Sequence, residues 1–157
     1  MIKVLFVCMG NICRSPMAEA VFQQMVDSAG LGKYFEIDSA GIGAWYVGEP
    51  AHDGTLAILR RNNIPYDGRS RQIERADMDE FDYVLAMDRE VMGYLRRYAT
   101  GTHAELRMFL DYAVAEGAVT TSEVPDPYYD GRFELVYNLV GHGCRALLAH
   151  IRKEHNL

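Results

Sequence analysis

Residues 2–16 read IKVLFVCMGNICRSP, an apolar run followed by a glycine-containing loop and a serine-proline pair. The apolar run predicts a short strand that ends at Val7, and Ser15-Pro16 predicts the N-cap and first turn of a helix. Backbone N–H groups of such a loop converge on an anion, and the helix N-terminus adds partial positive charge. The stretch therefore predicts a phosphate-binding loop.

Two reactive side chains flank this loop. Cys8 directly follows the strand, and Arg14 stands six positions later. The field that attracts an anion also stabilises a thiolate, and a planar guanidinium can hold two phosphate oxygens at once. The spacing predicts that Cys8 is a nucleophile and that Arg14 beside it binds phosphate. The alternative is an ordinary strand-to-helix turn that contains a cysteine.

Composition bounds the class of protein. The chain has 157 residues, of which 49% are hydrophobic and 24% charged, and this predicts one globular domain over residues 1–157. The net charge of −6 argues against a nucleic-acid partner, which would require a basic excess. No apolar run approaches a membrane span, and the N-terminal run is too short for a signal peptide. We expect a cytoplasmic protein that binds neither nucleic acid nor membranes.

The cysteines and histidines indicate neither a disulfide scaffold nor a metal site. Three cysteines, two of them in one loop, argue against a secreted disulfide scaffold. Cys144 lies in an apolar periodic segment and is predicted to be a core residue. The five histidines are scattered without a metal-ligand pattern, so we expect no metal and no other cofactor.

Strand-like and helical patterns alternate along the chain. The predicted strands are residues 2–7, 34–40, 83–87 and 106–110, and the predicted helices are 15–29, 52–61, 88–98 and a long one from Phe133. Residues 74–82 suggest a solvated turn or short helix, and residues 113–125 an exposed loop. The alternation predicts an α/β fold with a doubly wound, four-stranded parallel sheet flanked by helices. Ligands bind at the carboxyl ends of such strands, where Cys8 lies.

Asp126 is a candidate proton donor. A thiolate that attacks phosphorus must expel an alkoxide or phenoxide, so an acid that protonates the departing oxygen helps. Asp126 stands between Pro125 and Pro127, which stiffen the segment, and two tyrosines follow. An ordinary Asp-Pro turn is the alternative.

The chain resembles the low-molecular-weight protein tyrosine phosphatases over nearly its whole length. The resemblance is carried, in the family's order, by VCMGNICRSP (7–16), DSAG (38–41), WYVG (45–48), RQI (71–73), FDYVLAMD (81–88) and DPYY (126–129). It implies hydrolysis of phosphotyrosine through a phosphocysteine at Cys8, with Arg14 binding phosphate and Asp126 acting as general acid and then base. The implied partner is a tyrosine-phosphorylated protein, and we expect a monomer.

The resemblance also implies supporting residues. Ser15 would bond the Cys8 sulfur, and Asn11 would hold the strained loop backbone with Ser39 as its partner. The place of Cys13, five residues after Cys8 in the same tight loop, predicts either a reversible disulfide between the two or simple packing of Cys13. The residues expected to bind substrate are Met9, Gly10, Asn11, Ile12, Cys13, Ser15, Trp45, Tyr128 and Tyr129. Apolar and aromatic walls would favour phosphotyrosine over the shorter phosphoserine.

One departure from the family's pattern concerns a histidine that many members have a few residues before Arg-Gln. Residues 66–72 of this chain read YDGRSRQ, without a histidine. We therefore expect water or Arg69 to support the Asn11–Ser39 contact.

Three other functions remain as alternatives. A phosphoarginine phosphatase shares the fold, but that branch tends to have threonine at the position of Ile12. A thiol-dependent arsenate reductase resembles this chain in its loop but needs two further cysteines close together downstream, where this chain has only Cys144. A module that only binds phosphotyrosine would not require both Cys8 and Asp126.

Overall fold

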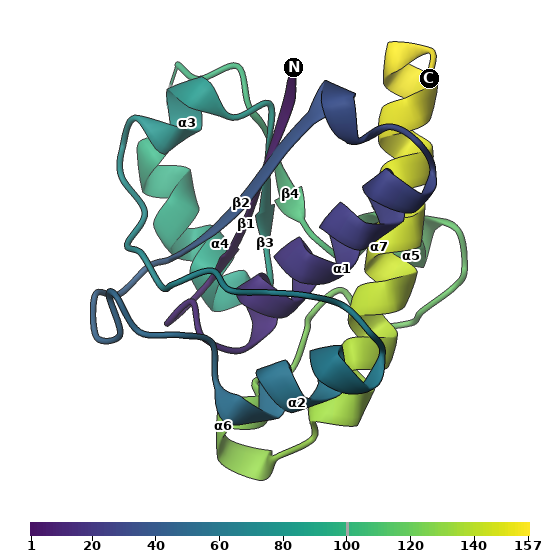
Figure 1. Cartoon of the computed structure of the whole chain (residues 1–157). Helices are drawn as coiled ribbons and strands as arrows, with labels where there is room; N and C mark the ends of the chain where they lie inside the picture. The colour runs from purple at the N-terminus through teal and green to yellow at the C-terminus, as the bar shows by residue number, and fades with distance from the viewer. Residues whose placement is uncertain (100) are drawn as a thin grey trace.

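The computed structural model describes residues 1–99 and 101–157 and shows a parallel sheet with helices on both faces (Figure 1). Its strands, in spatial order, are β2 (Phe35–Gly41), β1 (Ile2–Cys8), β3 (Tyr83–Ala86) and β4 (Glu105–Met108). The predicted doubly wound, four-stranded α/β sheet is confirmed. The chain leaves β1 toward β2 and leaves β3 toward β4, so a crevice opens between the carboxyl ends of β1 and β3.

The helices form one layer on each face of the sheet (Figure 1). One layer contains α1 (Arg14–Ser28), α2 (Asp53–Arg61), α5 (Asp111–Ala115) and α7 (Phe133–His155). The opposite layer contains α3 (Asp77–Glu80) and α4 (Arg89–Leu95). The short α6 (Pro127–Asp130) lies near α2. Two short segments form 3₁₀ helices, η1 (Gly32–Tyr34) and η2 (Arg96–Tyr98).

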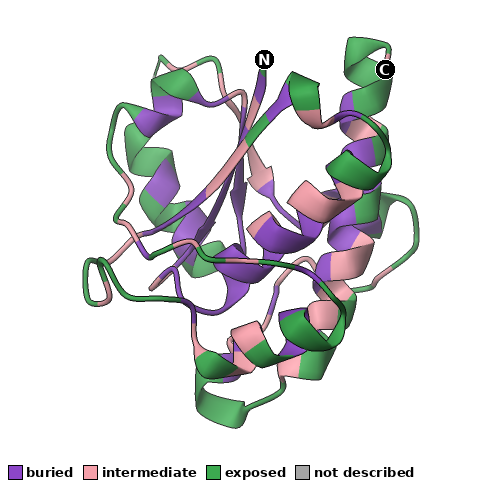
Figure 2. Cartoon of the chain, in the orientation of Figure 1, coloured by how far each residue is buried: buried purple, intermediate pink, exposed green. Residues whose placement is uncertain are grey.

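Alternate residues of β1 supply two separate cores. Val4 and Phe6 pack toward α1 and α7, whereas Leu5 and Val7 pack toward α3 and α4. Because helices cover both faces of a parallel sheet, its central strand is apolar at almost every position. Figure 2 shows this arrangement, with buried residues on the strands and on the inward sides of the helices.

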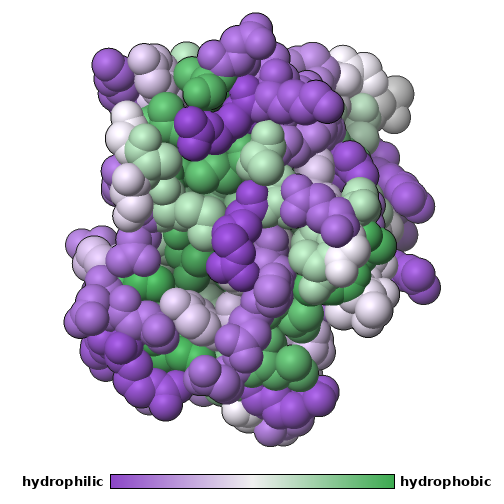
Figure 3. All heavy atoms as spheres, turned by 90° about the vertical axis from the view of Figure 1, so that its right-hand side faces the viewer, coloured by the Kyte–Doolittle hydropathy of each residue, from purple (hydrophilic) through white to green (hydrophobic). Residues whose placement is uncertain are grey.

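The predicted long helix from Phe133 is confirmed as α7. Its apolar residues that recur every three or four positions are fully buried: Val136, Val140, Cys144, Leu147 and Ile151. Gly143 permits close packing, because a Cβ there would lie 2.5 Å from the Phe109 ring. Gly141 has no such role, because the nearest side chain to a Cβ there would be 3.5 Å away. On the face that includes α7, hydrophobic areas are small and interrupted by hydrophilic side chains (Figure 3). No helix in the described ranges is both long and apolar enough to span a membrane.

Two local predictions are wrong. Ser15 is not the N-cap, because α1 already begins at Arg14 and the Ser15 hydroxyl bonds other side chains. Residues 113–125 are not all loop, because the short helix α5 buries Tyr112 and Ala113. The short helix expected within residues 74–82 is confirmed as α3, in which Asp77 is buried and pairs with Arg71 at 3.0 Å. Tertiary contacts decide these details, and local patterns do not record such contacts.

Candidate active site

The loop after β1 curls around the sulfur of Cys8. This sulfur accepts the Asn11 backbone N–H at 3.3 Å and lies 3.0 Å from the Ser15 hydroxyl oxygen. Asn11 has φ of 57°, in the left-handed region, which agrees with the strained loop backbone expected at this residue. Gly41 at the end of β2 lets the loop approach, because a Cβ there would stand 3.0 Å from the Asn11 nitrogen. The result is a concave backbone with an N–H group aimed at the thiol.

The side chain of Asn11 is bonded at both ends. Its Nδ2 donates to Ser15 Oγ at 2.8 Å and to Ser39 Oγ at 3.0 Å, and its Oδ1 accepts the Arg71 backbone N–H at 2.9 Å. A left-handed residue other than glycine costs about 1–2 kcal/mol, which these buried hydrogen bonds offset. Asn11 therefore fixes the shape of the loop.

Asn11 and Ser15 do not line the cavity above Cys8. Both are buried behind the loop, Ser15 completely. The expectation that Asn11 and Ser15 bind substrate stays a prediction, which no contact of their side chains with the cavity supports. They are placed to support the residues that face the cavity.

Arg14 lies at the base of the cavity with an almost fully buried guanidinium. Its Nη1 contacts Asp88 Oδ2 at 2.6 Å and donates to the Val124 carbonyl oxygen at 3.0 Å. Burial lowers the pKa of Arg14, but negative charge at Cys8 and the bond to Asp88 more than compensate and raise this pKa above its ordinary value. The guanidinium is therefore a permanent, oriented cation.

Asp88, the first residue of the predicted helix 88–98, is a site residue that the sequence analysis did not assign to the site. Its Oδ1 does cap α4 by accepting the Val91 N–H at 2.9 Å, while its Oδ2 holds Arg14. The signal that could have found it is its place directly after β3, because the ends of β1 and β3 border the same crevice.

Asp126 reaches the cavity from the far half of the chain. Its Oδ2 lies 3.8 Å from Arg14 Nη2, and its Oδ1 accepts the Tyr128 N–H at 3.0 Å as the cap of α6. The side chain is 36% exposed, so water reaches its carboxyl group. The structure thus brings together the cysteine loop and the carboxyl group singled out from the sequence.

A cavity of about 280 Å³ opens above the loop. Its lining residues are Cys8, Met9, Gly10, Ile12, Cys13, Arg14, Trp45, Tyr46, Asp126, Tyr128 and Tyr129. The rim is aromatic, with Trp45 68% and Tyr129 86% exposed. Tyr46, which sequence reasoning missed, lies with its ring centroid 6.4 Å from that of Tyr128. The cavity is therefore polar at its base and apolar around its mouth.

The remaining cysteines are buried, free thiols. Burial, with the nearby charge at Cys8, raises the pKa of Cys13 to about 12. Burial likewise raises the pKa of Cys144, which is fully buried in the core as predicted. The raised pKa values keep both thiols protonated near neutral pH. Cys8 differs from them because its sulfur is bonded by the Asn11 N–H and the Ser15 hydroxyl.

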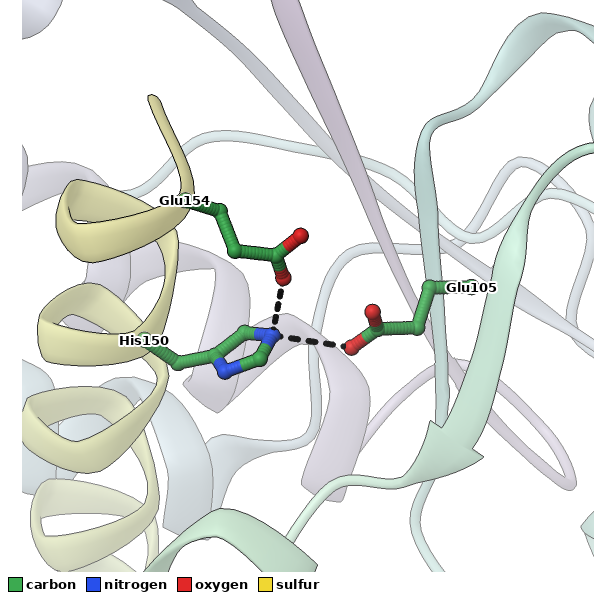
Figure 4. A group of neighbouring side chains, drawn as sticks. All are labelled: Glu105, His150 and Glu154. Atoms are coloured by element: carbon green, nitrogen blue, oxygen red, sulfur yellow. Dashed lines mark ion pairs between the residues drawn. The ribbon is translucent and has the colours of Figure 1, made fainter. Parts of the chain in front are cut away.

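A second group of titratable side chains joins α7 to β4, at the opposite end of the sheet. His150 Nε2 lies 3.1 Å from Glu105 Oε2 and contacts Glu154 Oε1, and the donor atoms lie within 4.8 Å of one another (Figure 4). Glu105 also accepts the Tyr112 hydroxyl. The histidine spacing gave no sign of this cluster, which folding creates. The three side chains thus link α7 to the first residue of β4.

Comparisons with known proteins agree over the full chain. The family model described as low molecular weight phosphotyrosine protein phosphatase matches residues 3–157. The low molecular weight protein-tyrosine-phosphatase YfkJ of Bacillus subtilis is 49% identical over 100% of both chains. PtpA of Staphylococcus epidermidis, which bears the same description, is 41% identical over 100% of this chain and 98% of its own.

Solved structures show the same similarity. The crystal structure of YfkJ superposes with a TM-score of 0.92 and covers 98% of this chain and 96% of that chain. A Drosophila arginine phosphatase superposes with a TM-score of 0.88 at 29% identity, covering 96% of this chain and 98% of that chain.

Proposed function

Because the chain belongs to the low molecular weight phosphotyrosine protein phosphatase family, we propose that it cleaves phosphotyrosine monoesters with Cys8, Arg14 and Asp126 as catalytic residues. The observation that carries this assignment is the meeting of the three side chains in one cavity, although Asp126 comes from the other half of the chain. Nucleophile, phosphate ligand and proton donor are the parts that this reaction needs.

In the first step the Cys8 thiolate attacks phosphorus. The S–P bond forms as the P–O bond to the tyrosyl oxygen breaks, and protonated Asp126 gives its proton to that oxygen. Arg14 binds two of the other phosphate oxygens and stabilises their charge in the transition state. The bonds from Asn11 N–H and the Ser15 hydroxyl to the sulfur favour the thiolate.

In the second step water hydrolyses the phosphocysteine. Asp126, now a carboxylate, takes a proton from the water as its oxygen bonds to phosphorus, and the S–P bond breaks. The Ser15 hydroxyl, 3.0 Å from the sulfur, stabilises the departing thiolate. Inorganic phosphate leaves, and Cys8 and Asp126 return to their starting states.

The walls of the cavity support an aryl substrate. Met9, Ile12 and the aromatic rim can pack on a phenyl ring, and burying such a ring contributes about 1.5–3 kcal/mol. A phosphoserine would reach the base without that contact. Ile12 also supports tyrosine over phosphoarginine, although the similarity to the Drosophila arginine phosphatase keeps the latter as a second candidate.

The test is hydrolysis of an aryl phosphate in the presence of a chelator by the parent, Cys8→Ser and Asp126→Ala. We expect no turnover by Cys8→Ser, and a loss by Asp126→Ala that grows as the leaving group becomes more basic. Turnover by Cys8→Ser would refute the mechanism, and an unchanged rate for Asp126→Ala on a basic leaving group would place the acid elsewhere. Parallel assays of phosphotyrosine and phosphoarginine peptides decide between the two substrates.

We further infer that residues 1–157 act as one phosphatase domain, as a cytoplasmic monomer, on tyrosine-phosphorylated proteins. The site draws its residues from both halves of one chain, which supports a single domain that is complete without a partner. The three free cysteines suit a reducing compartment. Sedimentation of the purified protein tests the monomer, and a dimer at assay concentrations would contradict it.

A further inference from the structure

A series of hydrogen bonds leads from the active-site loop to Tyr66. Ser39, which accepts from Asn11, donates its own hydroxyl to Glu19 Oε1 at 2.6 Å. The Tyr66 hydroxyl donates to the same oxygen at 2.9 Å. Tyr66 lies in the segment of the chain that connects α2 to α3, and it does not line the cavity. The hydrogen bonds nevertheless connect it through Asn11 to the loop around Cys8.

We propose that Tyr66 is a positioning residue of the phosphatase reaction, acting through Glu19 and Ser39 to hold Asn11 in its left-handed conformation. The inference rests on the proposed function, because it assigns Tyr66 a role in shaping the loop that binds phosphate. Tyr66 itself touches neither the substrate nor the reacting atoms.

The direction of the bonds explains why the Tyr66 hydroxyl matters. Glu19 as a carboxylate accepts from both hydroxyls, so the Ser39 proton is committed and its lone pairs are free for Asn11. Burial raises the pKa of Glu19, and the bonds from Ser39 and Tyr66 oppose that rise. Without the Tyr66 hydroxyl the carboxylate loses a donor, and a protonated Glu19 would compete to donate to Ser39.

The space around Gly68 supports the same role independently. A Cβ on Gly68 would lie 2.4 Å from the Tyr66 hydroxyl oxygen, although the backbone of Gly68 is outside the left-handed region. Glycine is therefore needed here to make room for the hydroxyl and not to allow a special backbone conformation. The histidine expected near this point is absent, and Tyr66 occupies the space beside Gly68.

Arg69 does not perform the task that the sequence suggested for it. Its Nη1 donates to the Gly48 carbonyl oxygen at 3.0 Å, away from Ser39 and Asn11. The expectation that Arg69 supports the Asn11–Ser39 contact is therefore wrong. Tyr66 and Glu19 provide that support instead.

The first experiment compares steady-state kinetics of Tyr66→Phe and Tyr112→Phe on an aryl phosphate. Both substitutions remove a hydroxyl that donates to a glutamate, but Tyr112 bonds Glu105 at the opposite end of the sheet. We expect Tyr66→Phe to lower kcat about tenfold, equivalent to about 1.4 kcal/mol, with KM within about twofold. We expect Tyr112→Phe to leave kcat unchanged. Equal kcat values for Tyr66→Phe and the parent would overturn the proposal.

The second experiment tests the contact between Tyr66 and Gly68 by a double-mutant cycle. Gly68→Ala should displace the hydroxyl and lower kcat in the parent, but cause no further loss in a Tyr66→Ala background. Gly93→Ala, whose Cβ would meet nothing within 4 Å, is the matched control and should leave kcat unchanged. Additive losses at positions 66 and 68 would overturn the proposal.

Failure of this inference is distinguishable from failure of the proposed function. If Cys8→Ser retained turnover, the function would fall whatever the Tyr66 variants showed. If Cys8→Ser were inactive and Tyr66→Phe fully active, the function would stand and only the positioning role would fall.

Discussion

Asp88→Asn removes one negative charge and one acceptor oxygen from the pair that holds Arg14. In the parent, Asp88 uses both oxygens, Oδ1 for the Val91 N–H and Oδ2 for Arg14. Asparagine has the same shape but only one acceptor oxygen, so one of these bonds must be lost. The substitution therefore separates the electrostatic role of Asp88 from its volume.

The size of the effect follows from which bond is lost. Loss of the cap costs about 1 kcal/mol, and loss of a charge-assisted bond costs about 1.5–3 kcal/mol. The side chain of Asp88 is only 20% exposed, so solvent screens this pair little. We expect the free energy of unfolding to fall by about 1–3 kcal/mol, and kcat/KM for an aryl phosphate to fall about tenfold or more as Arg14 loses its orientation.

Urea denaturation and steady-state kinetics measure the two effects. Asp53→Asn is the matched control, because Asp53 is an exposed aspartate in the first turn of α2. We expect the control to change stability by less than about 0.5 kcal/mol and to leave kcat/KM unchanged. If Asp88→Asn behaved like this control, the account of Arg14 as a residue held by its buried partner would be wrong.

Three further predictions concern packing and ionisation. Gly143→Ala should lower the free energy of unfolding by about 1–3 kcal/mol, because the new Cβ would lie 2.5 Å from the Phe109 ring, whereas Gly141→Ala should leave it unchanged. Equal urea midpoints for the two variants would contradict this prediction. Because burial raises the pKa of Cys13 to about 12, iodoacetamide at pH 8 should label Cys8 alone in the native protein, and peptide mapping that finds Cys13 modified would be contrary evidence. The pKa of Glu19 is raised in the folded protein, so its contribution to stability is present at pH values below the ordinary pKa of 4.5 and is lost as the pH rises through the folded pKa. Glu19→Gln should therefore flatten the dependence of the unfolding free energy on pH above 4.5, and an unchanged slope would exclude this linkage.

The sequence predicted those features that depend on local chemistry. The strand-loop-helix unit, the left-handed Asn11 and the stiff segment around Asp126 each have a residue type that suits one geometry. The alternation of apolar runs predicted the sheet, because a parallel sheet covered on both faces needs continuous apolar strands. Spacing in the chain was sufficient for these features.

Features that arise from contacts between distant segments were not predicted. Asp88 looked like a cap because its second oxygen meets Arg14 only after β1 and β3 pair. Tyr66 and Glu19 are separated by 47 positions, and nothing in either segment indicates that they meet. Ser15 had the residue type of a cap, but its hydroxyl is used by Cys8 and Asn11.

Trp45 at the mouth of the cavity is the only tryptophan in the chain. The ultraviolet fluorescence of the protein excited at long wavelength therefore originates at one position beside the site. Because the indole is largely in water, an aryl ligand that stacks on it would shift its emission toward shorter wavelength. Trp45 fluorescence can therefore report whether an aryl ligand occupies the cavity. The rate of ligand binding to the inactive Cys8→Ser variant can be measured in this way without an added label.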